Sequence, residues 1–563
     1  MEWKSVAAAL VVLAGCEVDV GDLGADPAST CALSAQTDLA WSLERSVSWG
    51  GPMGVSGHAV AVRDDGVLVA GSFAGTIDLD PGPQEQTAIG TPQGDPIGSG
   101  TYVSKLGLDG QLVWSAAFGG TRAAGADVRL SSGPQGEIYL AGRFSRPVDF
   151  DPGEGQQLRD PGEGYAGFVV RLEPDGRYGW VRTWERMVSH GGVPWVFVDT
   201  VGGLWVVHEH EAERLDPGTG GSQAALTFDD GGEILAAALR EDDVLVVARD
   251  AVYSTESTTD PVVEAYDLAG TLVWSYALAT PELSAITTVG SDTIVAGGFY
   301  DAGESGFAID AAGYDVHTGH GHRDAFATRL DADGQRRFTV TWGGLGHDRV
   351  DAVIPGPDST VFVAGSFYQT LHRTDRREAF DARDQDAYVM HLDPQGQTLG
   401  VRSWGGRGED EALGVDWAAG QGLWVIGSFD DELDAAAERE PVVHRSQGHS
   451  DALLLGLLPG ELEDGGSCSV EPVDLCGEQT SSRLSGTDLP PHFDACMRRT
   501  GSSSFAQSNG ERMCIFVVEA DADPPLFEQC RVAGGGLVEL EPGQACKINY
   551  DECDGPCFGN SCD

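Results

Sequence analysis

The sequence predicts an all-β protein in which repeated four-stranded sheets close into a ring, followed by a small disulfide-rich domain. Three observations lead to this fold class. The 563 residues include 78 glycines and 27 prolines, a composition typical of a chain with many turns. Three strand-like motifs recur in a fixed order along most of the chain. Nine of the 11 cysteines are crowded between Cys468 and the C-terminus.

The N-terminus resembles the signal of a bacterial lipoprotein. The apolar run Val6–Ala14 is too short to span a bilayer, and it leads into Leu13-Ala14-Gly15-Cys16. The resemblance implies cleavage before Cys16 and attachment of a diacylglycerol to its thiol. An ordinary secretory signal, with a cysteine at this place by coincidence, is the alternative. We therefore expect a signal peptide over residues 1–15 and a tether over residues 16–38.

The first motif is a β run of the form V-x-V-A-G-S-F. Five full copies and two degenerate copies occur. They are Val67–Phe73, Ile138–Phe144, Leu204–His210 (degenerate), Val244–Asp250 (degenerate), Thr293–Phe299, Val361–Phe367 and Leu423–Phe429.

The second motif is an apolar strand that ends in a Gly-containing turn, as in Phe326–Gly334, and the third is a strand that ends in an aromatic residue and two glycines. The aromatic positions are Trp49, Phe118, Trp342 and Trp404, with Trp184 in the equivalent place. Full copies lie about 62–69 residues apart, more than the roughly 40–50 that one four-stranded unit needs. The surplus lies in acidic loops between the first and second motifs.

The ends of the array predict that the ring closes. The last unit stops at Gly460 without a fourth strand, and the first begins with an unpaired strand, Leu39–Trp49. If this strand completes the last unit, main-chain pairing closes a seven-bladed β-propeller over residues 39–460. Six blades with one enlarged unit is the alternative, because residues 185–278 are the least regular stretch.

The combined pattern W-G-G, V-x-V-A-G-S-F and D-A-(Y/F)-V resembles the bacterial β-propeller repeat family, which is common among exported and lipidated proteins. The resemblance covers residues 39 to 460. It implies a seven-bladed propeller outside the cytoplasm and no particular activity.

The cysteines predict disulfides in an exported C-terminal domain, residues 461–563. After lipidation of Cys16 ten remain, and nine of them lie in this domain. The expected disulfide cysteines are Cys31, Cys468, Cys476, Cys496, Cys514, Cys530, Cys546, Cys553, Cys557 and Cys562. Because the domain holds an odd number, Cys31 should pair with one of its nine, with Cys468 or Cys476 the first candidates.

The net charge of −53 excludes two classes of partner. Nucleic-acid binding needs clustered cations, and so does adsorption to anionic lipid through a basic patch. Membrane attachment is therefore expected only through the lipid anchor, at the outer membrane or cell surface. Protein and glycan ligands both stay open.

Two acidic loops are candidate calcium sites. They contain Asp78 and Asp80 in the sequence IDLDPG, and Asp149 and Asp151 in VDFDPG. Carboxylates beside a tight turn offer the hard oxygen ligands that Ca²⁺ prefers, although neither loop matches an EF-hand. A solvated acidic loop that aids solubility is the alternative.

The two degenerate units hold a second candidate site. His208 and His210 replace part of the first motif, and Arg249 and Asp250 break it in the next unit. Residues two apart on a strand point the same way, so His208 and His210 could share a ligand. Sequence drift is the simpler alternative.

No enzyme signature such as GxSxG, HExxH or a P-loop is present, and no catalytic residue can be named. We expect an exported, lipid-anchored binding or scaffolding protein. The alternatives are a glycan-directed hydrolase, with its site on the acidic channel face, and a structural surface protein.

Overall fold

In a computed structural model of the protein, the described residues are 17–18, 29–32, 41–90, 98–120, 128–185, 193–228, 234–249, 261–279, 282–300, 307–311, 313, 315–319, 321–374, 379–436, 441–459, 469–470, 504–508, 513–517, 529–532, 536–539 and 546–548. The chain divides into two compact units, Asp38–Gly460 and a second that combines Met1–Thr37 with Glu461–Asp563. Within the described residues, no helix combines the length and apolar character that crossing a bilayer requires.

The larger unit is built from antiparallel sheets, six of which have four strands each among the described residues. Sheet A contains β4 (Val55–Arg63), β5 (Gly66–Ala74), β8 (Ser99–Leu106) and β9 (Leu112–Gly119). Sheet B contains β10 (Arg129–Ser132), β11 (Ile138–Phe144), β14 (Ala166–Leu172) and β15 (Tyr178–Trp184). Sheet C contains β16 (Trp195–Val198), β17 (Leu204–His208), β18 (Glu211–Leu215) and β19 (Ser222–Thr227). Sheet D contains β20 (Ile234–Leu239), β21 (Val244–Arg249), β22 (Val262–Asp267) and β23 (Leu272–Ala277). Sheet E contains β24 (Glu282–Val289), β25 (Asp292–Tyr300), β28 (Arg323–Leu330) and β29 (Arg336–Trp342). Sheet G contains β34 (Asp410–Ala418), β35 (Gly422–Phe429), β38 (Asp451–Pro459) and β3 (Trp41–Trp49).

One further sheet, sheet F, has six strands in the order β30-β31-β32-β33-β36-β37. The strands are β30 (Asp348–Pro355), β31 (Val361–His372), β32 (Ala379–Leu392), β33 (Thr398–Arg407), β36 (Glu432–Asp434) and β37 (Val443–Arg445). The last two form a hairpin that connects β35 to β38 of sheet G and pairs with β33. A short 3-10 helix, Pro357–Ser359, connects β30 to β31.

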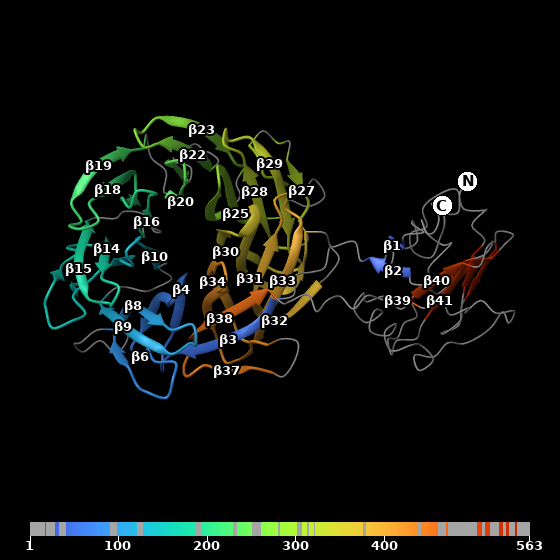
Figure 1. The fold of residues 1–563 in the computed structure, drawn as a ribbon, viewed down its shortest axis with the longest axis horizontal. Helices are drawn as coiled ribbons and strands as arrows, with labels where there is room; N and C mark the ends of the chain where they lie inside the picture. The colour runs from blue at the N-terminus through green and yellow to red at the C-terminus, as the bar shows by residue number, and fades with distance from the viewer. Residues whose placement is uncertain are drawn as a thin grey trace. The chain divides into compact units, whose positions relative to one another are not determined.

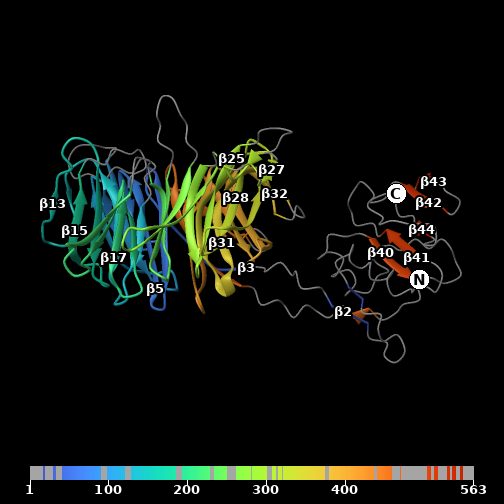
Figure 2. The ribbon, with the colours of Figure 1, turned by 90° about the horizontal axis from the view of Figure 1, so that it is seen from above.

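Three similar hairpins connect the second and third strands of sheets A, B and E. They are β6 (Thr76–Asp78) with β7 (Thr87–Ile89), β12 (Val148–Asp149) with β13 (Leu158–Arg159), and β26 (Phe307–Ala308) with β27 (Val316–His317). The hairpin of sheet A lies against the glycine pair that ends β3, since the Asp78 amide donates to the Gly50 carbonyl (2.9 Å). This long loop and this glycine pair therefore lie on the same face of the ring. Figure 2 shows the strands running between this face and the opposite one.

The ring closes as the sequence predicted. Strand β3, from the start of the propeller, pairs antiparallel with β38, from its end, over Trp41↔Pro459 to Trp49↔Ala452. Figure 1 shows this junction where the blue strand β3 lies beside the orange strand β38. The prediction of an all-β propeller fold is thus confirmed.

The core lies between neighbouring sheets, and the second strand of each sheet is buried on both faces. In β5, Val69 and Phe73 pack against sheet G, whereas Leu68 and Ala70 pack against sheet B. This explains the continuous apolar motif, because each large side chain stabilises the ring by about 1.5–3 kcal/mol when removed from water. Trp342 and Trp404 of the third motif are also buried between sheets.

The second unit contains short strands from both ends of the chain. Strands β1 (Glu17–Val18), β2 (Ser29–Ala32) and β39 (Ser469–Val470) form one sheet. Strands β40 (Ser504–Ser508), β41 (Met513–Val517) and β44 (Cys546–Ile548) form another, and β42 (Gln529–Val532) pairs with β43 (Gly536–Glu539).

Candidate functional site

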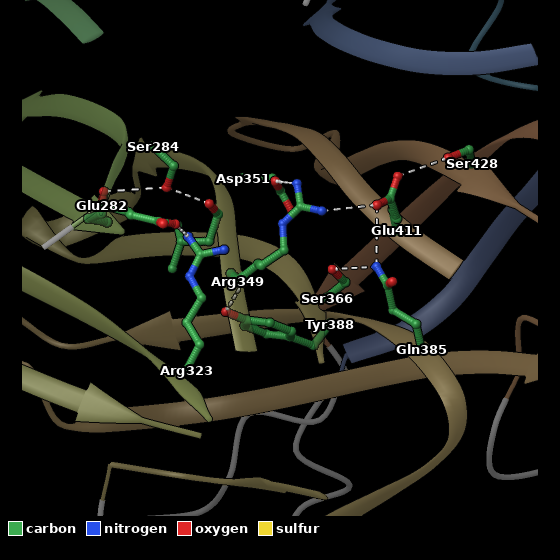
Figure 3. Close-up of polar contacts among 12 residues, drawn as sticks. Glu282, Ser284, Arg323, Arg349, Asp351, Ser366, Gln385, Tyr388, Glu411 and Ser428 are labelled. Carbon is green, nitrogen blue, oxygen red and sulfur yellow. Dashed lines mark hydrogen bonds and ion pairs between the residues drawn. The ribbon is translucent and has the colours of Figure 1, made fainter. Parts of the chain in front are cut away.

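A charged cluster lies on the first strands of sheets F and G, β30 and β34, which are called the inner strands below. Arg349 of β30 donates to the Asp351 carboxylate of the same strand (Nη2 to Oδ1, 2.7 Å) and to Glu411 of β34 (Nη1 to Oε1, 3.3 Å). Figure 3 shows the guanidinium between these two carboxylates. They raise the pKa of Arg349, Asp351 most strongly, so it stays charged. The Arg349 side chain is 38% exposed, so this cluster can meet a ligand.

Three further polar side chains hold Glu411 in place. The Gln385 amide nitrogen lies 3.3 Å from Glu411 Oε1 and 2.8 Å from Ser366 Oγ, and Ser428 Oγ lies 3.4 Å from Glu411 Oε2. Both carboxylate oxygens of Glu411 therefore have partners, from β32 and β35 as well as from Arg349, and Ser366 of β31 holds Gln385 in turn (Figure 3). A carboxylate held in this way presents a fixed charge.

Two side-chain hydrogen bonds to backbone carbonyls connect this region, one within sheet F and one to sheet E. Tyr388 Oη donates to the Arg349 carbonyl (2.8 Å), and Ser284 Oγ of sheet E donates to the Val350 carbonyl (2.5 Å). Sequence reasoning missed this cluster. A usable signal was the two-residue spacing of Arg349 and Asp351, which places both side chains on one face of a strand.

The four candidate calcium ligands lie in the first halves of two equivalent hairpins. Asp78 Oδ1 accepts from the Asp80 amide (3.1 Å) and, across the hairpin, from the Gln86 amide (2.8 Å). Asp149 Oδ1 accepts in the same way from the Asp151 (3.1 Å) and Gln157 (2.7 Å) amides.

The second aspartate of each hairpin also bonds to the turn. Asp80 Oδ1 accepts from the Gly82 amide (2.7 Å) and Asp151 Oδ1 from the Gly153 amide (2.8 Å). These bonds organise the turns, as aspartate side chains commonly do. They give the four carboxylates a structural role, and calcium binding stays a prediction.

The two degenerate units differ from the others at the same repeat position. On the second strand, one residue that faces the preceding sheet is glycine in five sheets: Gly71, Gly142, Gly297, Gly365 and Gly427. A Cβ at Gly71 would lie 2.0 Å from the Ser56 carbonyl oxygen, because the first strand bulges toward it. In sheet C the pairing of β16 with β17 ends at Trp195↔Val207, and His208 occupies the position. In sheet D the residue at this position is Arg249, although the first strand bulges there as it does in sheet A.

His208 and His210 do not share a strand. Strand β17 ends at His208, Glu209 has a positive φ of 46°, and His210 lies in the turn before β18. The argument that both imidazoles point the same way is therefore wrong. The tight turn instead places Glu211 directly opposite His208.

His208 is buried and lies beside Glu213. Its Nε2 is 4.0 Å from Glu213 Oε1, and its ring is 4.8 Å from the ring of Trp184 in sheet B. Burial lowers the pKa of His208 to about 4, so the imidazole is uncharged near neutral pH. His208, Glu211 and Glu213 each offer an atom within 4.8 Å of the others, a grouping that suits a metal ion.

Arg249 forms a buried ion pair with Glu264 of β22, and Tyr266 Oη donates to the same carboxylate (2.8 Å). The arginine is thus neutralised within its own sheet. Asp250 lies outside the described residues.

Two carboxyl groups with strongly raised pKa values lie at the starts of inner strands. Burial raises the pKa of Asp348 and of Asp410 to about 8, and neighbouring Asp324 and Asp386, respectively, add to the effect. Each is fully buried and accepts a hydrogen bond from the glycine pair before it, at Gly344 (2.9 Å) or Gly406 (2.8 Å). Their surroundings give them a structural role in the connection between sheets.

Two surface hollows are shallow and lined by different sets of residues. One, of about 410 Å³, is lined by turn residues 132–134 and 198–202 between sheets B and C. The other, of about 220 Å³, lies beside the end of β29 and is lined by His317, His372 and Arg373 among others. Neither hollow contains the carboxyl groups with raised pKa.

Of the cysteines, Cys31 lies on β2, Cys514 on β41, Cys530 on β42 and Cys546 on β44. Strand β2 pairs with β39 through Ser29↔Val470 and Thr30↔Ser469. Cys16 and the other predicted disulfide cysteines (Cys468, Cys476, Cys496, Cys553, Cys557 and Cys562) lie outside the described residues.

No known protein family and no curated protein matches the sequence. Many solved structures are similar in fold, at low identity. One is BamB from Moraxella catarrhalis, with 11% identity, a TM-score of 0.33, and coverage of 74% of this chain and 97% of that chain.

Two other similar structures come from different bacteria. A quinohemoprotein alcohol dehydrogenase from Pseudomonas putida HK5 has 10% identity and a TM-score of 0.38, and the match covers 77% of this chain and 78% of that chain. A protein of unknown function from Bacteroides caccae has 12% identity and a TM-score of 0.31, with 54% and 89% covered. At these levels the similarity concerns the fold.

Proposed function

We propose that this protein is a binding or scaffolding propeller that recognises a protein or glycan through the inner strands of sheets F and G. The observation that carries the proposal is the partly exposed Arg349 guanidinium, which two carboxylates from neighbouring sheets hold in place. Fixed charges on rigid strands favour recognition, because little side-chain freedom is lost on binding. A ligand that carries both hydrogen-bond donors and acceptors suits such a surface.

We further propose that sheet F is one blade, so that the ring has seven blades. Its strands β30-β31-β32-β33 have the same order as the strands of the other sheets. Its two additional strands belong to the connection between β35 and β38 and are thus supplied by sheet G.

The binding proposal is tested with protein and glycan arrays and the purified exported chain. We expect Arg349→Ala to weaken binding of the captured ligand at least tenfold. The matched control is Arg177→Ala, whose side chain is 78% exposed in an outer turn and pairs with Asp175. Equal loss in both variants, or no captured ligand in either array, would contradict the proposal. Hydrolysis of an arrayed glycan would favour the hydrolase instead.

Export and lipid anchoring through Cys16 are part of the same proposal. The sequence Leu13-Ala14-Gly15-Cys16 supports them. Cys16→Ser should move the protein from the membrane fraction to the soluble exported fraction. If the variant partitions with membranes as the wild type does, the anchor is not at Cys16.

A further inference from the structure

Sheet C has polar side chains at a position between its second and third strands where other sheets have a glycine beside an aromatic residue. In sheets A and F, the glycine of the second strand pairs with a buried tyrosine of the third, Gly71 with Tyr102 and Gly365 with Tyr388. In sheet C the equivalent pair is His208 with Glu211. Glu213, two residues further along β18, is buried beside them. Sheet C therefore lacks the apolar packing of the tyrosine and holds polar groups in its place. Burying polar groups costs free energy unless another interaction compensates for it.

The imidazole of His208 supplies an independent sign of a ligand. The residue is only 8% exposed, and its Nε2 atom is buried with no hydrogen-bond partner. This atom lies 4.0 Å from Glu213 Oε1, too far for a hydrogen bond. An unpaired buried polar atom costs about 1–3 kcal/mol, so an occupant that bonds to it would stabilise the sheet.

The surroundings orient Glu213 toward the same point. Arg182 of sheet B donates to Glu213 Oε2 (2.9 Å), which leaves Oε1 on the side of His208. The Trp184 indole nitrogen lies 3.4 Å from Oε1, and its ring contacts the imidazole at an angle of 40° between the ring planes. Such outer contacts commonly fix the ligands of metal sites. Glu211 completes the group from the tight turn and is partly exposed, which gives an ion a way in.

The geometry points to a binding site for Zn²⁺, formed by His208 Nε2 and the carboxylates of Glu211 and Glu213. Zinc bonds of about 2.0–2.1 Å at tetrahedral angles place ligand atoms about 3.3 Å apart. The three ligand atoms now lie within 4.8 Å of one another, with His208 Nε2 and Glu213 Oε1 4.0 Å apart, so small side-chain movements would bring them to an ion. Three protein ligands leave the fourth position open.

The ligand types favour zinc over the harder ions. An imidazole nitrogen suits zinc and its first-row neighbours, whereas Ca²⁺ and Mg²⁺ prefer oxygen ligands only. Sheet D offers a useful comparison, because Arg249 there supplies a permanent positive charge to the buried Glu264. In sheet C the equivalent residue is an uncharged histidine, and the ion would supply that charge.

The test is a Zn²⁺ titration of the full exported chain, with metal removed beforehand and thiols alkylated so that cysteines do not bind zinc. We expect His208→Gln and Glu213→Gln to lose one bound Zn²⁺ per chain, and Glu211→Gln to bind it at least tenfold more weakly. His391→Gln is the matched control, since His391 is also buried but its Nε2 pairs with Thr360 Oγ1 (2.8 Å). It should bind zinc like the wild type.

Circular dichroism checks that each variant folds. If His208→Gln does not fold, the partly exposed Glu211 variant decides. Equal stoichiometry and affinity for Zn²⁺ in the wild type and the Glu211 or His208 variant would overturn the assignment. Binding of Ca²⁺ or Mg²⁺ to the wild type as tightly as Zn²⁺ would also overturn it, because an imidazole-containing site should discriminate against both.

Discussion

The buried carboxyl group of Asp348 should make the propeller less stable as the pH rises. Burial raises its pKa from 3.8 to about 8, so the folded protein holds this proton more tightly than the unfolded chain. Stability from the protonated carboxyl is fully present below pH 3.8 and is lost as the pH rises through 8. The Asp348→Asn substitution keeps a neutral side chain at every pH, and its amide oxygen can still accept from the Gly344 amide.

The magnitude follows from the two pKa values. Each tenfold difference in proton affinity corresponds to about 1.4 kcal/mol. Between pH 5 and pH 8 the wild type should therefore lose on the order of 3–4 kcal/mol through this one group, and the variant should not. The difference in unfolding free energy between the variant and the wild type should therefore grow by this amount from pH 5 to pH 8. At pH 8 the variant should be the more stable, although it lacks a native carboxyl group.

The assay is denaturant unfolding at pH 5, 6, 7 and 8, followed by the fluorescence of buried tryptophans such as Trp342. The difference between variant and wild type is the informative quantity, since other groups titrate equally in both. Asp381→Asn, at an exposed position of β32, serves as the control and should track the wild type. Parallel curves for Asp348→Asn and the wild type across this pH range would refute the reasoning.

Three other outcomes are expected. Millimolar Ca²⁺ should raise the melting temperature above that in Na⁺ of equal ionic strength, and Asp78→Asn with Asp149→Asn should abolish the increase; an unchanged melting curve of the wild type would exclude a folded-state calcium site. Trp41→Ala should destabilise the propeller by about 3–5 kcal/mol in denaturant unfolding, because this buried closing-strand residue packs on Phe362; a loss below 1 kcal/mol would mean that closure contributes little. Non-reducing peptide mapping should find Cys31 bridged to Cys468, since these residues adjoin the paired Thr30 and Ser469 in the chain; a free thiol at Cys31 would contradict this.

Several features of the fold follow from local sequence patterns. The run V-x-V-A-G-S-F predicts a recurring strand, and β5, β31 and β35 are such strands. The unpaired first strand and the missing last strand predict closure, and β3 pairs with β38. Such patterns can be recognised because the burial of a strand limits which residues that strand can contain. The repeat provides several examples of the same pattern.

The roles of individual polar residues were less readable. The aspartates of IDLDPG and VDFDPG could be recognised as a repeated element, but their bonds to Gln86 and Gln157 cross a hairpin whose register the sequence leaves open. The continuation of the first motif into Leu204–His210 suggested a strand, yet β17 ends at His208. The positive φ at Glu209 begins a tight turn, so that Glu211 pairs with His208.

By itself, the sequence determined the all-β class, the repeat, the closing strand and the identity of the residues that break the pattern. Only the tertiary structure decided which charges meet, because Arg349 with Glu411 and Arg182 with Glu213 come from different sheets, 62 and 31 residues apart in the chain. Strand periodicity specifies the face on which a side chain lies. Which residue of the neighbouring sheet a side chain contacts depends on how the two sheets pack. That packing depends on the whole ring.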